Sequence, residues 1–389
     1  MRGGWNGEQG SAMLKEQPFT LGIEEEYLLV DQQTLELAVD PPKELMAECQ
    51  RMVGERVSPE FLSSQIEVDT KVCNNITEAR DDLSNLRRTI IETSANFGLA
   101  PIAASTHPFA AWTEQKATER ERYAHLESEM QAAARRLLIC GMHVHVGVGD
   151  DDLRIDLMNQ MRYFLPHLLM LSSSSPFWEG QETGLRSYRL TVFDALPRTG
   201  LPPTFNSYAD FQRHVSVLTD TGIIEDASMI WWDIRPSVRY PTLETRILDV
   251  CTNIEDSLCM AALSTCLLRC LYRMRLENRR WRIYNRMLLD ENRWRAMRYG
   301  FDQGLLDLAK SSVVPFDVLI DEILELIADD AAALDCVAEA NHARTIIKRG
   351  TSADRQVDVY QQAKNDGADE AEALREVTRF LVTETAAGF

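Results

Sequence analysis

The sequence lacks the short motifs that mark the commonest nucleotide and nucleophile sites. It contains no G-x-x-x-x-G-K-[ST] segment and no G-x-G-x-x-G segment after a predicted strand, which argues against a P-loop and against a Rossmann dinucleotide site. It also contains no G-x-S-x-G segment, the sequence of the nucleophile elbow in α/β-hydrolases. A bound nucleotide would therefore have to be held by metal ions and arginine side chains.

Targeting signals and long apolar runs are also missing. No apolar run reaches the roughly 18 to 20 residues that cross a bilayer, and the polar, glycine-rich residues 1–17 lack the apolar core of a secretory signal. The eight cysteines include no C-x-x-C pair, which is typical of reduced thiols in a reducing compartment. We therefore expect a cytoplasmic protein without a membrane partner, with residues 1–17 as a disordered leader.

Basic residues are in the minority. The chain has 41 Lys and Arg against 60 Asp and Glu, a net charge of -19. Nucleic acid is not expected as a partner, because binding to a polyphosphate backbone draws its affinity from clustered Lys and Arg. Residues 269–298 hold ten arginines interleaved with aromatic residues; in so acidic a chain an ion-paired helix surface is a better interpretation than a nucleic-acid site.

No Pro/Gly/Ser-rich linker divides the 389 residues, of which 45% are hydrophobic and 26% charged. This composition is that of a globular protein with a large core. We expect a single domain spanning residues 18–389.

Strand patterns occupy the first two thirds of the chain and helical patterns the last third. The proline-rich residues 173–210 are expected to form a long functional loop, and the helical period dominates from residue 254 onward. This order predicts an α+β fold with a mainly antiparallel sheet and a helical C-terminal part. The predicted strands are residues 19–30, 65–70, 99–104, 139–148, 229–234 and 242–250, with a break at Arg235 and Pro236. The predicted helices before residue 173 are residues 75–98, 119–136 and 153–172.

Alternate residues of a strand share a face, which pairs several charged side chains. Glu24 and Glu26 point together, whereas Ile23, Glu25 and Tyr27 point the other way. The same spacing pairs Glu67 with Gln65 and Asp69, His143 with His145, and Glu244 with Arg246.

A polar face in contact with water would explain any one of these strands. Four of them as neighbours would gather Glu24, Glu26, Glu67, His143 and Glu244 on one face, and that face would repel itself unless cations bound there. Oxygen ligands with one histidine suit Mg²⁺ or Mn²⁺ better than structural zinc.

Arginines complement the carboxylates. Arg246 lies one pleat from Glu244 and Arg235 precedes Pro236, while further arginines fall in the loop-rich segment. Guanidinium groups bind carboxylates and phosphates bidentately, although each arginine alone could also form a surface ion pair. The arginines of the loop-rich segment are Arg186, Arg189 and Arg198.

Six short segments occur in a characteristic order: residues 22–27 (GIEEEY), 105–109 (STHPF), 141–147 (GMHVHVG), 232–237 (WDIRPS), 243–246 (LETR) and 353–356 (ADRQ). Together they resemble the carboxylate-amine ligase family of the glutamate-cysteine ligase type 2, within the glutamine synthetase-like superfamily. The resemblance runs from about residue 19 to 360.

The resemblance implies a curved antiparallel sheet with helices on one face, Mg²⁺ ions on the open face, ATP as a co-substrate and a homodimer or higher homo-oligomer. By motif, Arg246 would face the transferred γ-phosphate and act in catalysis together with Glu26. Arg189 or Arg235 would hold a substrate carboxylate or phosphate. His145 is a less certain ligand, and Arg355 of the ADRQ segment receives no role. The metal ligands implied are Glu24, Glu26, Glu67, His143 and Glu244.

The implied activity is ATP-dependent ligation of a carboxylate, such as glutamate, to an amine, such as cysteine or another amino acid. An acyl phosphate forms first and the amine then displaces phosphate, so no protein nucleophile is required. Two alternatives stay open: an ATP-independent metallohydrolase that uses His143 and His145, and a non-catalytic binding protein on the same fold.

Overall fold

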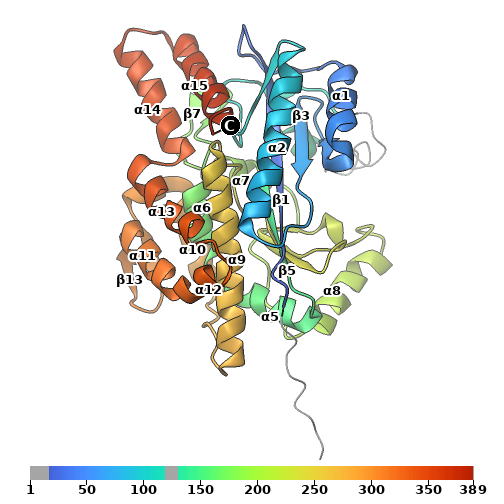
Figure 1. Cartoon of the computed structure of the whole chain (residues 1–389), viewed down its shortest axis with the longest axis vertical. Coiled ribbons are helices and arrows are strands. Elements are labelled where there is room, and N and C mark those ends of the chain that lie inside the picture. Colours follow the sequence, from blue (N-terminus) through green and yellow to red (C-terminus); the bar gives the residue numbers. More distant parts are fainter. Residues whose placement is uncertain (1–16, 119–129, 389) are drawn as a thin grey trace, which may run out of the picture.

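The structure is a computed structural model that describes residues 17–118 and 130–388 (Figure 1). Its main sheet has seven strands, and every strand pair in it is antiparallel. The strands are β1 (Leu21–Asp31), β2 (Val57–Pro59), β3 (Gln65–Asp69), β4 (Leu99–Ile102), β5 (Met142–Gly147), β10 (Ile234–Pro236) and β11 (Thr242–Thr245). Their order is β10-β11-β5-β1-β3-β2, with β4 beside the second half of β1. The predicted α+β fold is confirmed.

The central strand β1 gives the sheet two different faces. Ile23, Glu25 and Tyr27 are buried on one face, whereas Glu24 and Glu26 are half-buried on the other. This alternation is the period of two that a strand imposes on its side chains. The sheet therefore has a buried back face and an open acidic face, as the sequence predicted.

Two long helices cover the back face. α2 (Ile76–Ala95) and α9 (Ile254–Leu276) lie side by side and pack against β1 (Figure 1). Asn75 is the N-cap of α2: its side chain accepts a hydrogen bond from the Glu78 backbone N–H at 2.9 Å and so satisfies one donor at the helix end. α9 also packs against β5 and is buried along most of its length.

A fully buried ion pair fastens β1 to both helices. Arg87 of α2 donates to both carboxylate oxygens of Glu25, at 2.7 and 2.8 Å, and neither side chain is exposed. Ser257 of α9 donates to the same carboxylate at 2.5 Å, and Tyr27 donates to it as well. Arg87 also donates to the Cys251 carbonyl oxygen at 2.8 Å. The charge of Glu25 is thus neutralised inside the protein.

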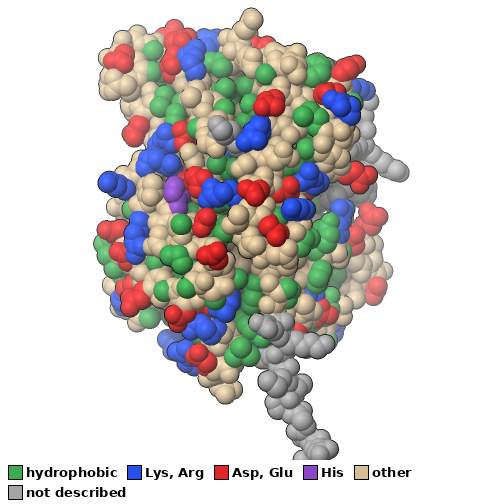
Figure 2. All heavy atoms as spheres, in the orientation of Figure 1, with side chains coloured by type: hydrophobic (Ala, Val, Ile, Leu, Met, Phe, Trp, Pro, Cys, Tyr) green, Lys and Arg blue, Asp and Glu red, His purple; other side chains and the backbone are tan. Residues whose placement is uncertain are grey.

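The predicted helical C-terminal part is confirmed, with one short hairpin inserted in it. Figure 2 shows acidic and basic side chains interspersed over the face of the molecule seen in Figure 1. After α9 come α10 (Arg286–Tyr299), the hairpin of β12 (Leu305–Asp307) and β13 (Ser312–Val314), α11 (Phe316–Leu326), α12 (Ala328–Ala333), α13 (Val337–Arg349), α14 (Ser352–Asn365) and α15 (Glu370–Thr385).

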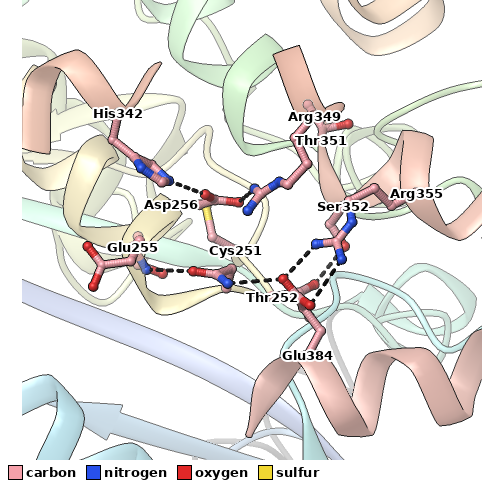
Figure 3. Close-up of polar contacts among 12 residues, drawn as sticks. Cys251, Thr252, Glu255, Asp256, His342, Arg349, Thr351, Ser352, Arg355 and Glu384 are labelled. Carbon is pink, nitrogen blue, oxygen red and sulfur yellow. Dashed lines mark hydrogen bonds and ion pairs between the residues drawn. The ribbon is translucent and has the colours of Figure 1, made fainter. Parts of the chain in front are cut away.

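A polar network joins the start of α9 to the last helices (Figure 3). Asp256 pairs with His342 at 2.8 Å and with Arg349 at 2.5 Å. Arg355 of the ADRQ segment forms a bidentate pair with Glu384 of α15, at 2.6 and 3.0 Å. These contacts give Arg355 a structural place between two helices, away from the acidic face.

The arginine-rich residues 269–298 are ion-paired at many positions. Asp330 of α12 is fully buried and pairs with two of these arginines. The pairs are Arg269 and Arg273 with Asp330, Arg275 and Arg280 with Asp156, and Arg293 with Asp194 and Asp233. The ion-paired interpretation therefore holds for this segment.

Several predicted elements differ from the observed ones. The helix predicted over residues 153–172 is divided into α5 (Asp151–Met161) and α6 (Leu165–Ser172), because Pro166 in the first turn of α6 cannot continue the hydrogen bonds of a preceding helix. Arg235 and Pro236 lie inside β10 instead of breaking it. β10 is the edge strand of the sheet, where a missing backbone N–H is tolerated.

The predicted strand over residues 229–234 and the long loop over residues 173–210 also change. The first contains the short β9 (Trp231–Trp232), which pairs in parallel with β8 (Thr199–Gly200), and Ile234, the first residue of β10. The loop contains the hairpin of β6 (Phe177–Trp178) and β7 (Gln181–Glu182), β8, and α7 (Arg189–Phe193). Elements of two to five residues are too short to show a period in sequence. The remaining helices are α1 (Lys43–Val53), α4 (Ala132–Arg135) and α8 (Tyr208–Asp220).

Parts of two predictions lie outside the described residues, namely residues 1–16 of the leader and residues 119–129 of a helix. Gln17 is buried, and its side-chain oxygen accepts a hydrogen bond from the Gly149 backbone N–H at 2.8 Å. The single domain over residues 18–389 stays a prediction, which one continuous cluster of buried apolar side chains supports. Across the described ranges, no helix has the length and apolar character to cross a membrane.

We predict that Glu25→Gln destabilises the protein by about 3 kcal/mol or more, because it leaves the buried Arg87 charge without its counter-ion. The measurement is the free energy of unfolding from denaturant titration. Arg51→Gln serves as the control, since Arg51 pairs with Glu48 on the exposed surface and its loss should leave the unfolding midpoint almost unchanged. A Glu25→Gln variant as stable as the control would contradict this account of the buried pair.

Candidate active site

The open face of the sheet brings the predicted ligands into adjacent rows. β11, β5, β1 and β3 are neighbours in that order. In the middle row, Glu24 of β1 lies between His143 of β5 and Asp69 of β3. In the next row, Glu26 lies opposite Glu67. Four strands that are distant in sequence therefore present one continuous acidic surface.

His145 and Glu244 form the row on the other side of Glu24. They are cross-strand partners between β5 and β11. His143 Nδ1 hydrogen-bonds Glu24 Oε2 at 2.8 Å, and His145 Nε2 lies 2.8 Å from Glu24 Oε1. Glu24 thus lies between two imidazoles, which places His145 beside the site as well as His143.

Three groups of ligand-type side chains have atoms within 4.8 Å of one another. They are Glu24, His143 and Glu244; Glu24, Glu67 and Asp69; and Glu26, Glu60 and Glu67. Carboxylate oxygens with one imidazole are the ligands that Mg²⁺ and Mn²⁺ favour. The donor set therefore fits the divalent cation that the sequence predicted.

Two of these residues were not among the predicted ligands. Asp69 shares a face with Glu67, and the alternation in β3 was sufficient to place it there. Glu60 follows β2, which pairs with β3 through the register of Ser58 opposite Glu67. No spacing in the sequence indicates Glu60, because its position beside Glu67 depends on how the three-residue strand β2 pairs with β3.

Burial and mutual repulsion raise the pKa values on the acidic side of the site. Burial together with the charge of Glu60 raises the pKa of Glu26 to about 8, and burial together with Glu24 raises the pKa of Asp69 to about 7. Burial and the neighbouring carboxylates raise the pKa of Glu67 well above its usual range. Without a cation, these carboxyl groups retain protons near neutral pH, and a divalent cation would displace those protons.

The histidine side of the site has the opposite pattern. Burial, together with the charge of the nearby Arg246, lowers the pKa of His143 to about 4. Its imidazole is therefore neutral at pH 7, the form that binds metals. Burial would raise the pKa of Glu24, but the contacts with His143 and His145 outweigh burial and hold that pKa well below its usual range.

Two arginines hold Glu244. Arg235 donates to its two oxygens at 2.9 and 3.2 Å, and Arg246 Nη1 also hydrogen-bonds it. Burial alone would raise the pKa of Glu244, but these two charges lower it. Both oxygens of Glu244 are thus occupied by guanidinium groups, and a cation at Glu244 would compete with them.

The two arginines differ in how far contacts within the protein satisfy their hydrogen-bond donors. Arg235 gives its remaining donors to the carbonyl oxygens of Ser228 and Ile230, both at 2.8 Å, so it is largely satisfied within the protein. Arg246 Nη1 lies 3.4 Å from His143 Nδ1, and its buried Nε has no hydrogen-bond partner. A buried donor without a partner is costly, which favours Arg246 over Arg235 as the group that meets a ligand.

A cavity of about 1710 Å³ lies over the acidic face. This exceeds the 300–1,000 Å³ of a typical small-molecule pocket, so the space suits more than one ligand. Arg189 also lines the cavity, whereas Arg186 and Arg198 do not. Arg186 pairs with Asp354 at 2.6 Å, and Arg198 donates to the Met229 carbonyl oxygen at 2.9 Å. The hairpin tip that carries Arg239 and Tyr240 forms part of the cavity wall.

Comparison with known proteins places this chain in a family. The model of the family described as "Glutamate-cysteine ligase family 2(GCS2)" matches residues 20–378. A Rhodospirillum rubrum protein with the name "Putative glutamate--cysteine ligase 2" is 58% identical over 378 residues, covering 96% of this chain and 97% of the relative. A protein of the same name from Jannaschia sp. is 54% identical over 364 residues, covering 94% and 96%.

Solved structures share the fold at low sequence identity. The glutamate-cysteine ligase of Francisella tularensis in complex with AMP has a TM-score of 0.67 at 14% identity, covering 96% of this chain and 90% of its own. A bifunctional glutathione synthetase from Pasteurella multocida has a TM-score of 0.67 at 13% identity, covering 94% of this chain and 52% of its own.

We predict that Mn²⁺ or Mg²⁺ binding to the protein strengthens as the pH rises from 6 to 8 and releases protons. The raised pKa values, about 8 for Glu26 and about 7 for Asp69, mean that both carboxyls are largely protonated at pH 6. At pH 8 Asp69 is largely ionised and Glu26 is about half ionised. Each displaced proton adds about tenfold in affinity per pH unit below the pKa. Calorimetric titration in two buffers of different ionisation enthalpy measures the proton count.

Asp69→Asn is the matched variant for this titration, because it keeps the shape of the side chain and removes one titrating group. It should release fewer protons than the unsubstituted protein. Cation binding that is independent of pH over this window would contradict the electrostatic description of the site.

Proposed function

The chain belongs to glutamate-cysteine ligase family 2, and from this premise we propose that it is an ATP-dependent ligase that joins a carboxylate to an amine. The observation that carries the proposal is the acidic face itself. Glu24, Glu26 and Glu67 lie beside Asp69 and Glu60 under a large cavity, with Arg189 and Arg246 at its wall. A polyphosphate could approach so acidic a surface only through cations and guanidinium groups.

We propose Glu24, Glu26, Glu67 and His143 as the residues that hold divalent cations, with Glu60 and Asp69 added to them. Glu244 is the weaker candidate while Arg235 and Arg246 occupy its oxygens. Mg²⁺, or Mn²⁺ in its place, would supply neutralisation and alignment of the phosphate oxygens of ATP. The donor set given above supports this assignment.

The chemistry is a transfer in two steps. An oxygen of the substrate carboxylate attacks the γ-phosphorus of ATP, the bond from that phosphorus to the β,γ-bridging oxygen breaks, and ADP leaves. Arg246, with its unpartnered Nε, is proposed to neutralise the charge on the transferred phosphoryl group. The amine nitrogen then attacks the acyl carbon, loses a proton, and phosphate departs.

Glutamate and cysteine are the first substrates to test, because relatives bear the name of a ligase for this pair. Arg189 is proposed to hold a substrate carboxylate or phosphate, since it lines the cavity beside Glu26. Arg235 is the less suitable candidate, because Glu244 and two carbonyl oxygens occupy its donors. The cytoplasmic location and the homodimer or higher homo-oligomer are expectations from the resemblance and accompany this proposal.

The two alternative functions have less support. A metallohydrolase built on His143 and His145 would need further His and Asp ligands at the strand ends of a parallel barrel. The main sheet is antiparallel instead, and among the described residues that line the cavity these two are the only histidines. A non-catalytic protein would be expected to have lost ligands of the acidic face, and Glu24, Glu26 and Glu67 are all present there.

The test is release of ADP from Mg-ATP by the purified protein, with glutamate and a panel of amines that includes cysteine and hydroxylamine. Hydroxylamine traps an acyl phosphate as a hydroxamate. ADP release that requires the divalent cation and both organic substrates, with hydroxamate formation, is the expected result. No ATP consumption with any pair, or hydrolysis of a substrate without ATP, would contradict the proposal.

We also predict that Glu26→Gln lowers ATP turnover by roughly 10²-fold or more while leaving the melting temperature close to that of the unsubstituted protein, because the variant loses charge at the proposed cation site and keeps its shape. Turnover and thermal unfolding are measured on the same preparation. Glu376→Gln, at an exposed position of α15, is the control and should match the unsubstituted protein in both. Retained turnover in Glu26→Gln would remove Glu26 from the site.

A further inference from the structure

The row of the sheet that contains Glu26 continues beyond β5. Gly141, just before β5, exchanges hydrogen bonds with Glu26: its carbonyl accepts from the Glu26 backbone N–H at 3.1 Å, and its N–H donates to Glu26 Oε2 at 2.7 Å. On its other side Gly141 forms an antiparallel bridge with Asp249. Because cross-strand partners point to the same face, Asp249, Gly141 and Glu26 lie in one row on the open face.

The guanidinium group of Arg189 occupies the space that a side chain at residue 141 would otherwise fill. A Cβ atom at residue 141 would lie 2.3 Å from Arg189 Nη2 and 2.9 Å from its Cζ. Arg189 Nη1 lies 4.0 Å from Asp249 Oδ1, and the carboxylate of Glu26, which lies on the other side of Gly141 in the row, also attracts Arg189. The absence of a side chain at residue 141 therefore lets Arg189 lie between two carboxylates of the row.

Arg189 is buried but poorly satisfied. Its side chain is 4% exposed and still lines the cavity. Its closest hydrogen bonds are long, at 3.3 Å to the Arg246 carbonyl oxygen and 3.4 Å to the Ile247 carbonyl oxygen. A guanidinium group held this loosely by its own protein keeps donor capacity for a ligand.

Asp249 is fully buried and uses both oxygens to hold the segment that carries Arg189. Oδ2 accepts from the Ser174 backbone N–H at 2.9 Å and from Ser175 Oγ at 2.8 Å, and Oδ1 accepts from Ser187 Oγ at 2.9 Å. Ser175 Oγ in turn accepts from the Arg189 backbone N–H at 3.1 Å. Asp249 thus fixes the main chain of Arg189 through serine hydroxyls and faces its guanidinium group directly.

We infer that Asp249 is a positioning residue for ligation, which holds Arg189 over Gly141 so that its guanidinium group meets the carboxyl or phosphoryl group of a substrate bound beside Glu26. The inference rests on the proposed function. Asp249 itself does not line the cavity, so its action passes through Arg189.

The ADRQ segment (residues 353–356) holds the same serine segment through further hydrogen bonds. Gln356 donates to the Ser174 carbonyl oxygen at 2.9 Å, and the Ala353 backbone N–H donates to the Ser173 carbonyl oxygen at 3.0 Å. Asp354 pairs with Arg186, one residue before Ser187. The ADRQ segment therefore supports the site through these contacts with the serine segment and Arg186, although none of its residues lines the cavity.

The test compares Arg189→Gln, Asp249→Asn and Gly141→Ala in steady-state kinetics with each substrate varied in turn. Arg189→Gln identifies the substrate whose KM depends on the guanidinium group. Asp249→Asn and Gly141→Ala should raise that same KM by roughly tenfold or more, the effect of a lost charge-assisted contact, and leave the other KM values within about twofold. Gly141→Ala is the most informative of the three variants, because its added methyl group displaces the Arg189 side chain without removing a charge.

A double-mutant cycle separates positioning from general destabilisation. In an Arg189→Gln background, Asp249→Asn and Gly141→Ala should change the affected KM by less than about twofold, since residues that act through one another are not additive. Asp330→Asn is the matched control: it also alters a buried carboxylate held by arginines, but at a distance from the cavity, and should leave every KM unchanged. Ser187→Ala replaces Asp249→Asn if the latter does not fold.

An active protein in which Gly141→Ala and the Asp249 or Ser187 variant leave all KM values unchanged would overturn the inference and leave the proposed function intact. Additive effects in the Arg189→Gln background would also overturn it. If the unsubstituted protein does not consume ATP with any of the substrate pairs, the proposed function is overturned, and with it this role of Asp249.

Discussion

Repulsion among the carboxylates on the open face of the sheet is the constraint on which the rest of the structure depends. β1 carries three consecutive glutamates, and the period of a strand sends them to opposite sides. Glu25 meets Arg87 in the core and is neutralised permanently. Glu24 and Glu26 lie beside further carboxylates instead, and burial together with the charge of Glu60 raises the pKa of Glu26 to about 8 in the absence of a cation. One strand thus separates a structural charge from charges that are available to ligands.

The back of the sheet holds these like charges close together. The pair of Glu25 and Arg87, with Ser257, joins β1 to α2 and α9, and the cost of breaking a buried pair keeps the strand in place. On the open side, the arginines are fixed in different ways. Arg235 is satisfied by Glu244, whereas Arg246 keeps a buried donor without a partner. A rigid frame with selected unsatisfied groups is the arrangement that electrostatic catalysis requires.

The sequence was informative wherever one strand or one period carried the information. Alternation in β1 and β3 placed Glu24, Glu26 and Glu67 on one face, and the order of strands and helices gave the fold class. It was not informative where the position of a residue depends on pairing between distant segments. Glu60 follows a three-residue strand, and the engagement of Arg235 by Glu244 depends on the register of β10 with β11. The place of Arg189 above Gly141 requires three segments to meet, which no local spacing indicates.

The central claim is that divalent cations neutralise this acidic face and carry the phosphates of ATP. The most direct measurement is anomalous diffraction from crystals grown with Mn²⁺ and a non-hydrolysable ATP analogue. The account predicts manganese peaks among Glu24, Glu26, Glu67 and His143, each within bonding distance of a carboxylate and at least one also bound to a phosphate oxygen. An analogue bound elsewhere, or a nucleotide at this face without manganese beside these carboxylates, would contradict it.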